Sequence, residues 1–103
     1  MAEARALEAQ TKAAATERQI TLDVASAART LGASDRAAAA TTRARQAAET
    51  ELRATQTGYR VGASSSFEVS FARSSYAQAV VDELSALYDL EKARATLEIG
   101  VGR

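Results

Sequence analysis

The apolar positions in the first half of the chain repeat with the period of a coiled coil. They step along the sequence by intervals of three and four residues, which places them on one face of a helix. The members of this first series are Ile20, Val24, Ala27 and Leu31. The same alternation continues in a shifted phase through Ala37, Ala40, Ala44 and Ala47. We therefore predict a helix whose apolar face shifts around its axis near Gly32.

Helix-breaking residues are rare in this half of the chain. Proline is absent and Gly32 is the only glycine before Gly58, so little interrupts a helix over residues 2–60. An uninterrupted helix of about 55 residues is about 80 Å long. Because a compact domain of 103 residues is much smaller than that, we expect an extended rod.

A cluster of glycine and serine between Gly58 and Ser66 is the one concentrated run of turn-forming residues. Gly62 can adopt a positive φ without steric cost, which suits the C-terminal end of a helix. Ser65 precedes Glu68 by three residues, the spacing of a capping box at a helix start. We predict that the chain reverses over residues 61–65.

The second helix is predicted over residues 66–99, with Gly100 and Gly102 as its stop. Its main apolar stripe keeps the alternation of three and four, and it is broken only at Glu83. The members of this stripe are Val69, Ala72, Tyr76, Ala79, Ala86, Leu90, Ala93 and Leu97. A second stripe, about 100° around the helix, consists of Ala77, Val81, Leu84, Tyr88, Ala95 and Ile99. Two stripes indicate neighbours on two sides, in a closed ring of helices or as the broad face of an ordinary bundle.

Together these patterns predict an all-α fold, a single antiparallel two-helix coiled-coil hairpin with unequal arms over residues 1–103. More than half of the apolar residues are alanine, which favours helix but buries little area per residue. An isolated hairpin of this composition should be marginally stable in water. We therefore expect the chain to form a homo-oligomer.

The charged and reactive residues narrow the function further. Thirteen basic and thirteen acidic residues cancel, so we expect neither a nucleic-acid partner nor an anionic membrane surface. The chain has no histidine, cysteine or tryptophan, which removes the usual general base, thiol nucleophile and soft metal ligands. No stretch approaches the ~18 apolar residues of a membrane-spanning helix. We predict a protein that is not an enzyme and holds no cofactor or metal.

Residues 59–69, Tyr-Arg-Val-Gly-Ala-Ser-Ser-Ser-Phe-Glu-Val, resemble the hairpin tip of the TolC-like outer membrane efflux proteins. The resemblance continues downstream in the order of alanine, aromatic, leucine and glycine positions. These positions are Ala72, Tyr76, Ala79, Tyr88, Leu90, Ala93, Leu97 and Gly100. The resemblance covers about residues 50–103, and the earlier helix agrees with the family in composition and length.

The resemblance implies that the chain is one periplasmic hairpin of an outer-membrane efflux duct in a Gram-negative cell envelope, trimeric in the full-length parent. The tip would dock onto a periplasmic adaptor protein of a multidrug or metal efflux pump or of a type I secretion pump. The tip residues implied in this contact are Tyr59, Arg60, Val61, Gly62, Ala63, Ser64 and Ser65.

Some members of that family narrow the pore with a tyrosine, an arginine and two acidic residues near a tip. Tyr59 and Glu68 stand at matching positions, whereas Ser64 and Phe71 replace the arginine and the second acid. Glu68 is thus either a gate residue or a carboxylate that caps the second helix. For the whole chain, two other interpretations stay open: the hairpin of the periplasmic adaptor itself, and a generic helical-bundle interaction module.

Overall fold

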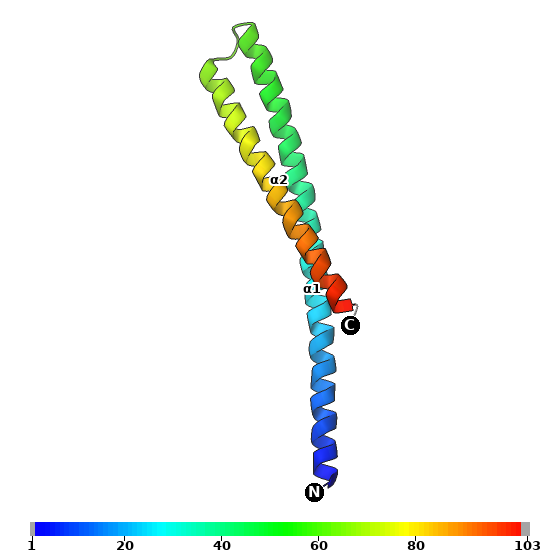
Figure 1. Cartoon of the computed structure of the whole chain (residues 1–103). Helices are drawn as coiled ribbons and strands as arrows, with labels where there is room; N and C mark the ends of the chain where they lie inside the picture. Colours follow the sequence, from blue (N-terminus) through cyan, green and yellow to red (C-terminus); the bar gives the residue numbers. More distant parts are fainter. Residues whose placement is uncertain (1, 102–103) are drawn as a thin grey trace.

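The computed structural model describes residues 2–101 and contains two antiparallel helices joined at a tip (Figure 1). Helix α1 runs over Ala2–Arg60 and helix α2 over Ser66–Val101, and residues 2–101 contain no strand. This confirms the predicted all-α hairpin with unequal arms. Helix α2 continues through Gly100 to Val101, past its predicted end, and Gly102 lies outside the described residues.

The hairpin is an extended rod. It measures 89 × 19 × 13 Å and has a radius of gyration of 24.6 Å, whereas a compact domain of this size has a radius of about 13 Å. The long dimension is that of α1, because 59 residues at ~1.5 Å per residue span about 88 Å. Helix α2 pairs only with the part of α1 nearer the tip, so residues 2–23 form an exposed overhang (Figure 1).

On α2 the seam between the helices follows the predicted main stripe. Tyr76, Ala79 and Leu97 are half-buried, and the other apolar members are buried, namely Val69, Ala72, Ala86, Leu90 and Ala93. A small core forms where Ala86 and Leu90 meet Ala38 of α1, with Leu31 packed against them. Because most of these side chains are alanine, the seam is thin and brings the helices together through small contacts.

On α1 the seam differs from the prediction. The seam positions predicted after Gly32 are exposed, namely Ala37, Ala40, Ala44 and Ala47. The prediction that the apolar face of α1 shifts near Gly32 is therefore wrong. Ile20 is also exposed, because it lies on the overhang. The seam instead keeps the phase of Val24, Ala27 and Leu31. It continues through buried or half-buried residues of mixed type, namely Ser34, Ala38, Thr41, Arg45, Ala48, Leu52 and Thr55.

Polar residues in the seam explain why the apolar pattern alone does not identify the buried face of α1. Alanine occurs on every face of this helix, so its periodicity carries little information about which face is buried. A threonine is tolerated in the seam because its hydroxyl can bond to its own helix. Thr41 Oγ1 donates to the carbonyls of Ala37 at 3.0 Å and Ala38 at 2.9 Å.

The second stripe of α2 stays exposed in the hairpin. All six of its residues are exposed, including Val81 at 58%, Leu84 at 61% and Tyr88 at 69%. Val81 is two residues from both Ala79 and Glu83, which places it about 160° from each of these seam positions. The stripe therefore lies on the outer side of α2, farther around the helix than predicted, and has no partner within one hairpin.

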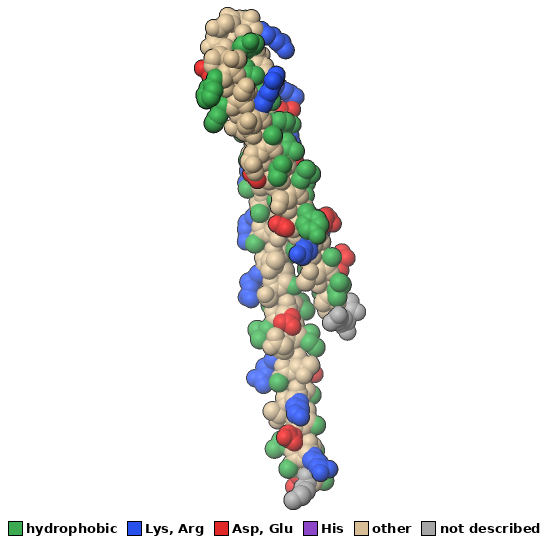
Figure 2. Space-filling model, turned by 60° about the vertical axis from the view of Figure 1, so that its left-hand side comes forward, with side chains coloured by type: hydrophobic (Ala, Val, Ile, Leu, Met, Phe, Trp, Pro, Cys, Tyr) green, Lys and Arg blue, Asp and Glu red, His purple; other side chains and the backbone are tan. Residues whose placement is uncertain are grey.

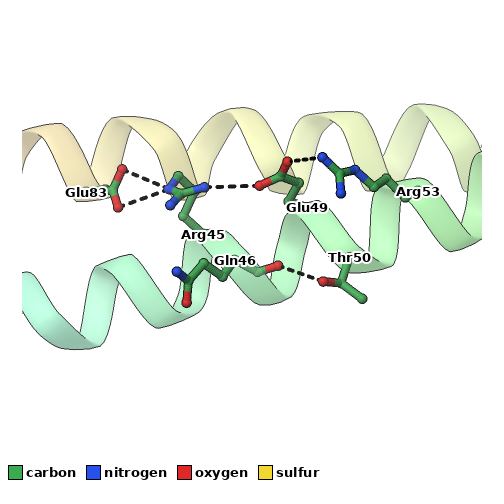
Figure 3. Close-up of polar contacts among 6 residues, drawn as sticks. All are labelled: Arg45, Gln46, Glu49, Thr50, Arg53 and Glu83. Atoms are coloured by element: carbon green, nitrogen blue, oxygen red, sulfur yellow. Dashed lines mark hydrogen bonds and ion pairs between the residues drawn. The ribbon is translucent and has the colours of Figure 1, made fainter.

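An ion pair occupies the middle of the seam (Figure 3). Glu83, which interrupts the apolar stripe of α2, faces Arg45 at the matching seam position of α1. Arg45 Nε lies 2.9 Å from Oε1 and 3.0 Å from Oε2 of Glu83, and the two side chains expose only 25% and 15% of their area. Glu49 extends the network, because it accepts from Arg45 at 3.1 Å and from Arg53 at 2.6 Å.

The pairing favours the charged form of both partners. The hydrogen bond from Arg45 lowers the pKa of Glu83 and outweighs the opposing effect of partial burial, and the Thr42 hydroxyl lowers it further. The same bond raises the pKa of Arg45. Glu83 is therefore a carboxylate that the folded hairpin stabilises.

Removing one partner of this pair should destabilise the hairpin more than removing a surface arginine. We expect R45A and E83A each to lower the midpoint of thermal unfolding by several degrees, because each leaves a charge in the seam without its partner. The double replacement R45L/E83L should recover most of the loss, since an apolar pair also fills the seam. Circular dichroism during heating measures this, with R43A, an exposed arginine, as control. Equal midpoints for R45A, E83A and R43A would contradict the prediction.

The stability contributed by Glu83 should disappear in acid. Its folded pKa lies below the ordinary value of 4.5, so near that pH the unfolded chain binds more protons than the native hairpin, and stability falls as pH falls. The contribution is complete above about pH 4.5 and is lost as the pH drops through the folded pKa. E83Q should therefore show a flatter fall in unfolding midpoint below that pH than the wild type. E91Q, which alters an exposed pair with Arg94, should follow the wild type.

Candidate functional site

The reversal at the tip is closed by main-chain hydrogen bonds. Gly62 has a φ of +79°, as predicted from its place at the end of the first helix. Its N–H donates to the Tyr59 carbonyl at 3.2 Å, and the Ala63 N–H donates to the Gly58 carbonyl at 2.7 Å. These are the two bonds of a Schellman motif, which satisfies the last carbonyls of a helix.

Gly58 allows the tip to close tightly, a role that sequence reasoning misses. A Cβ added at Gly58 would lie 3.3 Å from the Ser64 Cβ and closer still to its hydroxyl, so a side chain there would push Ser64 outward. The Gly58 carbonyl also accepts from the Ser64 N–H at 3.1 Å. The sequence does contain a signal for this role. Gly58 stands four residues before Gly62, and in a Schellman motif the carbonyl at that position accepts a hydrogen bond from the loop.

Ser65 caps the start of α2, as predicted. Its Oγ accepts a hydrogen bond from the Glu68 N–H at 3.1 Å and so satisfies one of the free amides at the helix start. The Glu68 side chain is exposed in the first turn, where the helix dipole favours a negative charge. Among the bonds of the described residues, none returns from the Ser65 N–H to the Glu68 carboxylate, so only half of the predicted capping box forms.

The residues predicted to contact a partner form the end of the rod (Figure 1). Val61 exposes 77% of its area and Tyr59 exposes 54%. Ser64 is the exception, because it is half-buried against Gly58. The remaining members are exposed, namely Arg60, Gly62, Ala63 and Ser65. A protein approaching the end of the rod therefore meets small side chains, one valine, one tyrosine and one arginine.

Two shallow grooves lie behind the tip, one on each side of the seam, and they differ in charge. The acidic groove is lined by Ala48, Glu51, Thr55, Phe67, Glu68, Phe71, Ala72 and Ser75. The basic groove is lined by Gln56, Tyr59, Arg60, Ser66, Val69, Ser70 and Arg73. Near the tip, Figure 2 shows hydrophobic side chains on one edge of the rod and basic side chains on the other. The two gate candidates are thus separated, with Tyr59 in the basic groove and Glu68 in the acidic groove.

Within residues 2–101, no group of three or more acidic side chains is placed to hold a metal ion. The buried side-chain nitrogen and oxygen atoms of these residues all have hydrogen-bond partners.

Neither helix, over the residues described, has an apolar stretch long enough to cross a membrane.

The tip glycine and a mid-helix glycine should respond oppositely to alanine. G62A should destabilise the hairpin by roughly 1 kcal/mol, because the left-handed conformation is unfavourable for a residue with a Cβ. G32A should stabilise it by about 0.5–1 kcal/mol, because alanine favours helix and the added Cβ would meet only Arg36 Nη1 at 3.7 Å. Urea unfolding followed by circular dichroism measures both. A stable G62A variant would show that the tip can close without the positive φ.

Comparison with known proteins gives one family match, which covers the whole chain. The family model described as "Outer membrane efflux protein" matches residues 1–103, so the match includes α1, where the resemblance rests only on composition and length. No curated protein and no solved structure matches the chain. Members of this family are transport channels rather than enzymes, and the match favours an efflux duct over an adaptor hairpin or a generic bundle. The chain therefore belongs to the outer membrane efflux protein family.

Proposed function

We propose that this chain forms a periplasmic coiled-coil segment of an outer-membrane efflux duct and that its tip docks onto a periplasmic adaptor protein. The observation that carries the proposal is an exposed tip of small residues at the end of an 89 Å rod, in a chain of the efflux family. The adaptor would belong to a multidrug or metal efflux pump or to a type I secretion pump.

The chemistry of the tip supports docking by shape. Gly62 and Ala63 present almost no side chain, so another backbone can approach closely. The first turn of α2 has amide groups without partners inside the helix, and the exposed Ser65 lies beside them. Val61 supplies one apolar contact and Arg60 one hydrogen-bonding cation. The proposed contact set is Tyr59, Arg60, Val61, Gly62, Ala63, Ser64 and Ser65.

The body of the rod supports a place in the wall of a duct. A single hairpin leaves the outer stripe of α2 uncovered, including Val81, Leu84 and Tyr88. Neighbouring hairpins of an oligomer would cover such a stripe, and the full-length parent is proposed to be a trimer. A ring of these rods would then enclose a passage through the periplasm.

Tyr59 and Glu68 are the proposed residues for narrowing that passage. They line grooves on opposite sides of the hairpin, so a direct contact between them would join two neighbouring hairpins and not one. Within a single hairpin, Glu68 acts as the acidic residue of the first turn of α2.

Site-directed crosslinking in the full-length parent tests the docking. The chain contains no cysteine, so A63C introduces a unique thiol at the tip of this segment, and A13C introduces one on the overhang of α1. We expect a thiol-reactive photocrosslinker at A63C to capture the adaptor and the same reagent at A13C to capture none, because only the tip reaches it. Adaptor capture from A13C without capture from A63C would remove the docking proposal.

A further inference from the structure

We infer that the outer face of α1 binds an acidic helix of another protein, whose carboxylates lie along a row of three arginines. The arginine row consists of Arg29, Arg36 and Arg43. It lies well away from the tip, since Arg43 is about 26 Å along the helix from Arg60 at the end of α1. The inference therefore goes beyond the proposed function and does not depend on adaptor docking.

The arginine row is straight and points away from α2. Its members follow one another at intervals of seven residues, which places them on one side of α1, about 10.5 Å apart. Each stands two residues from a seam position on either side, as Arg43 does from Thr41 and Arg45, and so lies about 160° from both. All three side chains are exposed. Figure 2 shows Lys and Arg side chains following one another along one edge of the rod.

Within the described hairpin the arginine row has no carboxylate partner. A helical ion pair forms between residues three or four positions apart, and these positions around the row carry only alanine, glycine, serine or glutamine. Among residues 2–101 no member of the row takes part in an ion pair, whereas Arg45, Arg53 and Arg94 all do. The three guanidinium groups are therefore available to an outside anion, and each can bind a carboxylate through two parallel N–H groups.

The surface around the row favours a helix over a flexible polymer. Both sides of the row carry exposed small residues, namely Ala33 and Ala40 on one side and Ala25 and Ala39 on the other. Another helix can approach such a surface closely, because the distance between packed helices depends on the side chains at the contact. Carboxylates at every seventh position of that helix would lie about 10.5 Å apart, which is the spacing of the arginine row.

The sequence of this chain does not contain the matching acidic helix. Its carboxylates at seven-residue intervals occur only as pairs, namely Asp82 with Asp89 and Glu91 with Glu98. The apolar outer stripe of α2 is also an unsuitable cover for the row, because burying a guanidinium group without a partner is unfavourable. The inferred partner is therefore a different protein, with a helix that carries three or more carboxylates at seven-residue intervals.

Synthetic helices test the spacing on the 103-residue chain. One peptide of about 21 residues, rich in alanine and glutamine, carries glutamate at every seventh position. A control peptide of the same composition carries glutamate at every fifth position, which spreads the charges around the helix. With both peptides shown to be helical by circular dichroism, we expect fluorescence anisotropy at low ionic strength to give about tenfold tighter binding of the first. Equal dissociation constants, or no binding of the first peptide, would overturn the inference.

Paired substitutions test the row itself. R36Q/R43Q should weaken binding of the first peptide at least about fivefold, because it removes two of the three cations that face the glutamates. K12Q/R18Q removes the same charge from the exposed overhang, so it is the matched control and should bind as the wild type does. Equal losses in the two variants would show attraction by net charge alone and would contradict the inference. Competition by unfolded polyglutamate as strong as that of the first peptide, at equal carboxylate concentration, would contradict it too.

Crosslinking in the full-length parent identifies the partner. A40C places a thiol beside the arginine row, and A13C, on the overhang, is the control. We expect a thiol-reactive photocrosslinker at A40C, but not at A13C, to capture a segment of another protein that mass spectrometry shows to have carboxylates at seven-residue intervals. Capture of a second copy of this chain, of a segment without such carboxylates or of nothing would overturn the inference. Adaptor capture at A63C is read separately, so either proposal can fail while the other stands.

Discussion

The ion pair between Arg45 and Glu83 determines how the two helices are matched along their length. Most other seam positions of α1 carry alanine, serine or threonine, and side chains of such similar size would fit nearly as well after a slip of one heptad. Such a slip of seven residues would set Arg45 against Tyr76 or Leu90 and leave both charges in the seam without partners. Both grooves depend on this one register, because each is lined by side chains of α1 and α2.

The fold could be predicted from the sequence because its strongest signals are local. The clean alternation on α2 and the glycine and serine run at the tip each report on a few neighbouring residues, and the structure has α2, Gly62 and Ser65 in the expected roles. The seam of α1 was predicted wrongly because its local pattern is weak. Alanine occurs on all sides of this helix and so indicates no preferred face. Arg45 looks like a surface residue until the register is known, so its pairing with Glu83 could not be read from either helix alone.

In the candidate site, too, one part could be predicted from the sequence and another could not. The end of the rod follows from the turn signal, so the exposed tip could be placed in advance. The two grooves could not be predicted from the sequence. Each one combines side chains from α1 and α2, so it exists only after the two helices are aligned. Family membership adds what a single hairpin lacks, namely that proteins of this family are transport channels and trimerise in general.

The way the tip is closed has a consequence for how such a protein changes over evolution. The loop is fixed by main-chain bonds to the carbonyls of Gly58 and Tyr59, so Arg60, Val61 and Ala63 carry no structural duty through their side chains. Mutations at these three positions would leave the hairpin intact while changing the surface that the proposed docking uses. In the proposed docking, contacts made through these three side chains would be separate from the requirements of folding, and a lineage would then be free to exchange one partner for another.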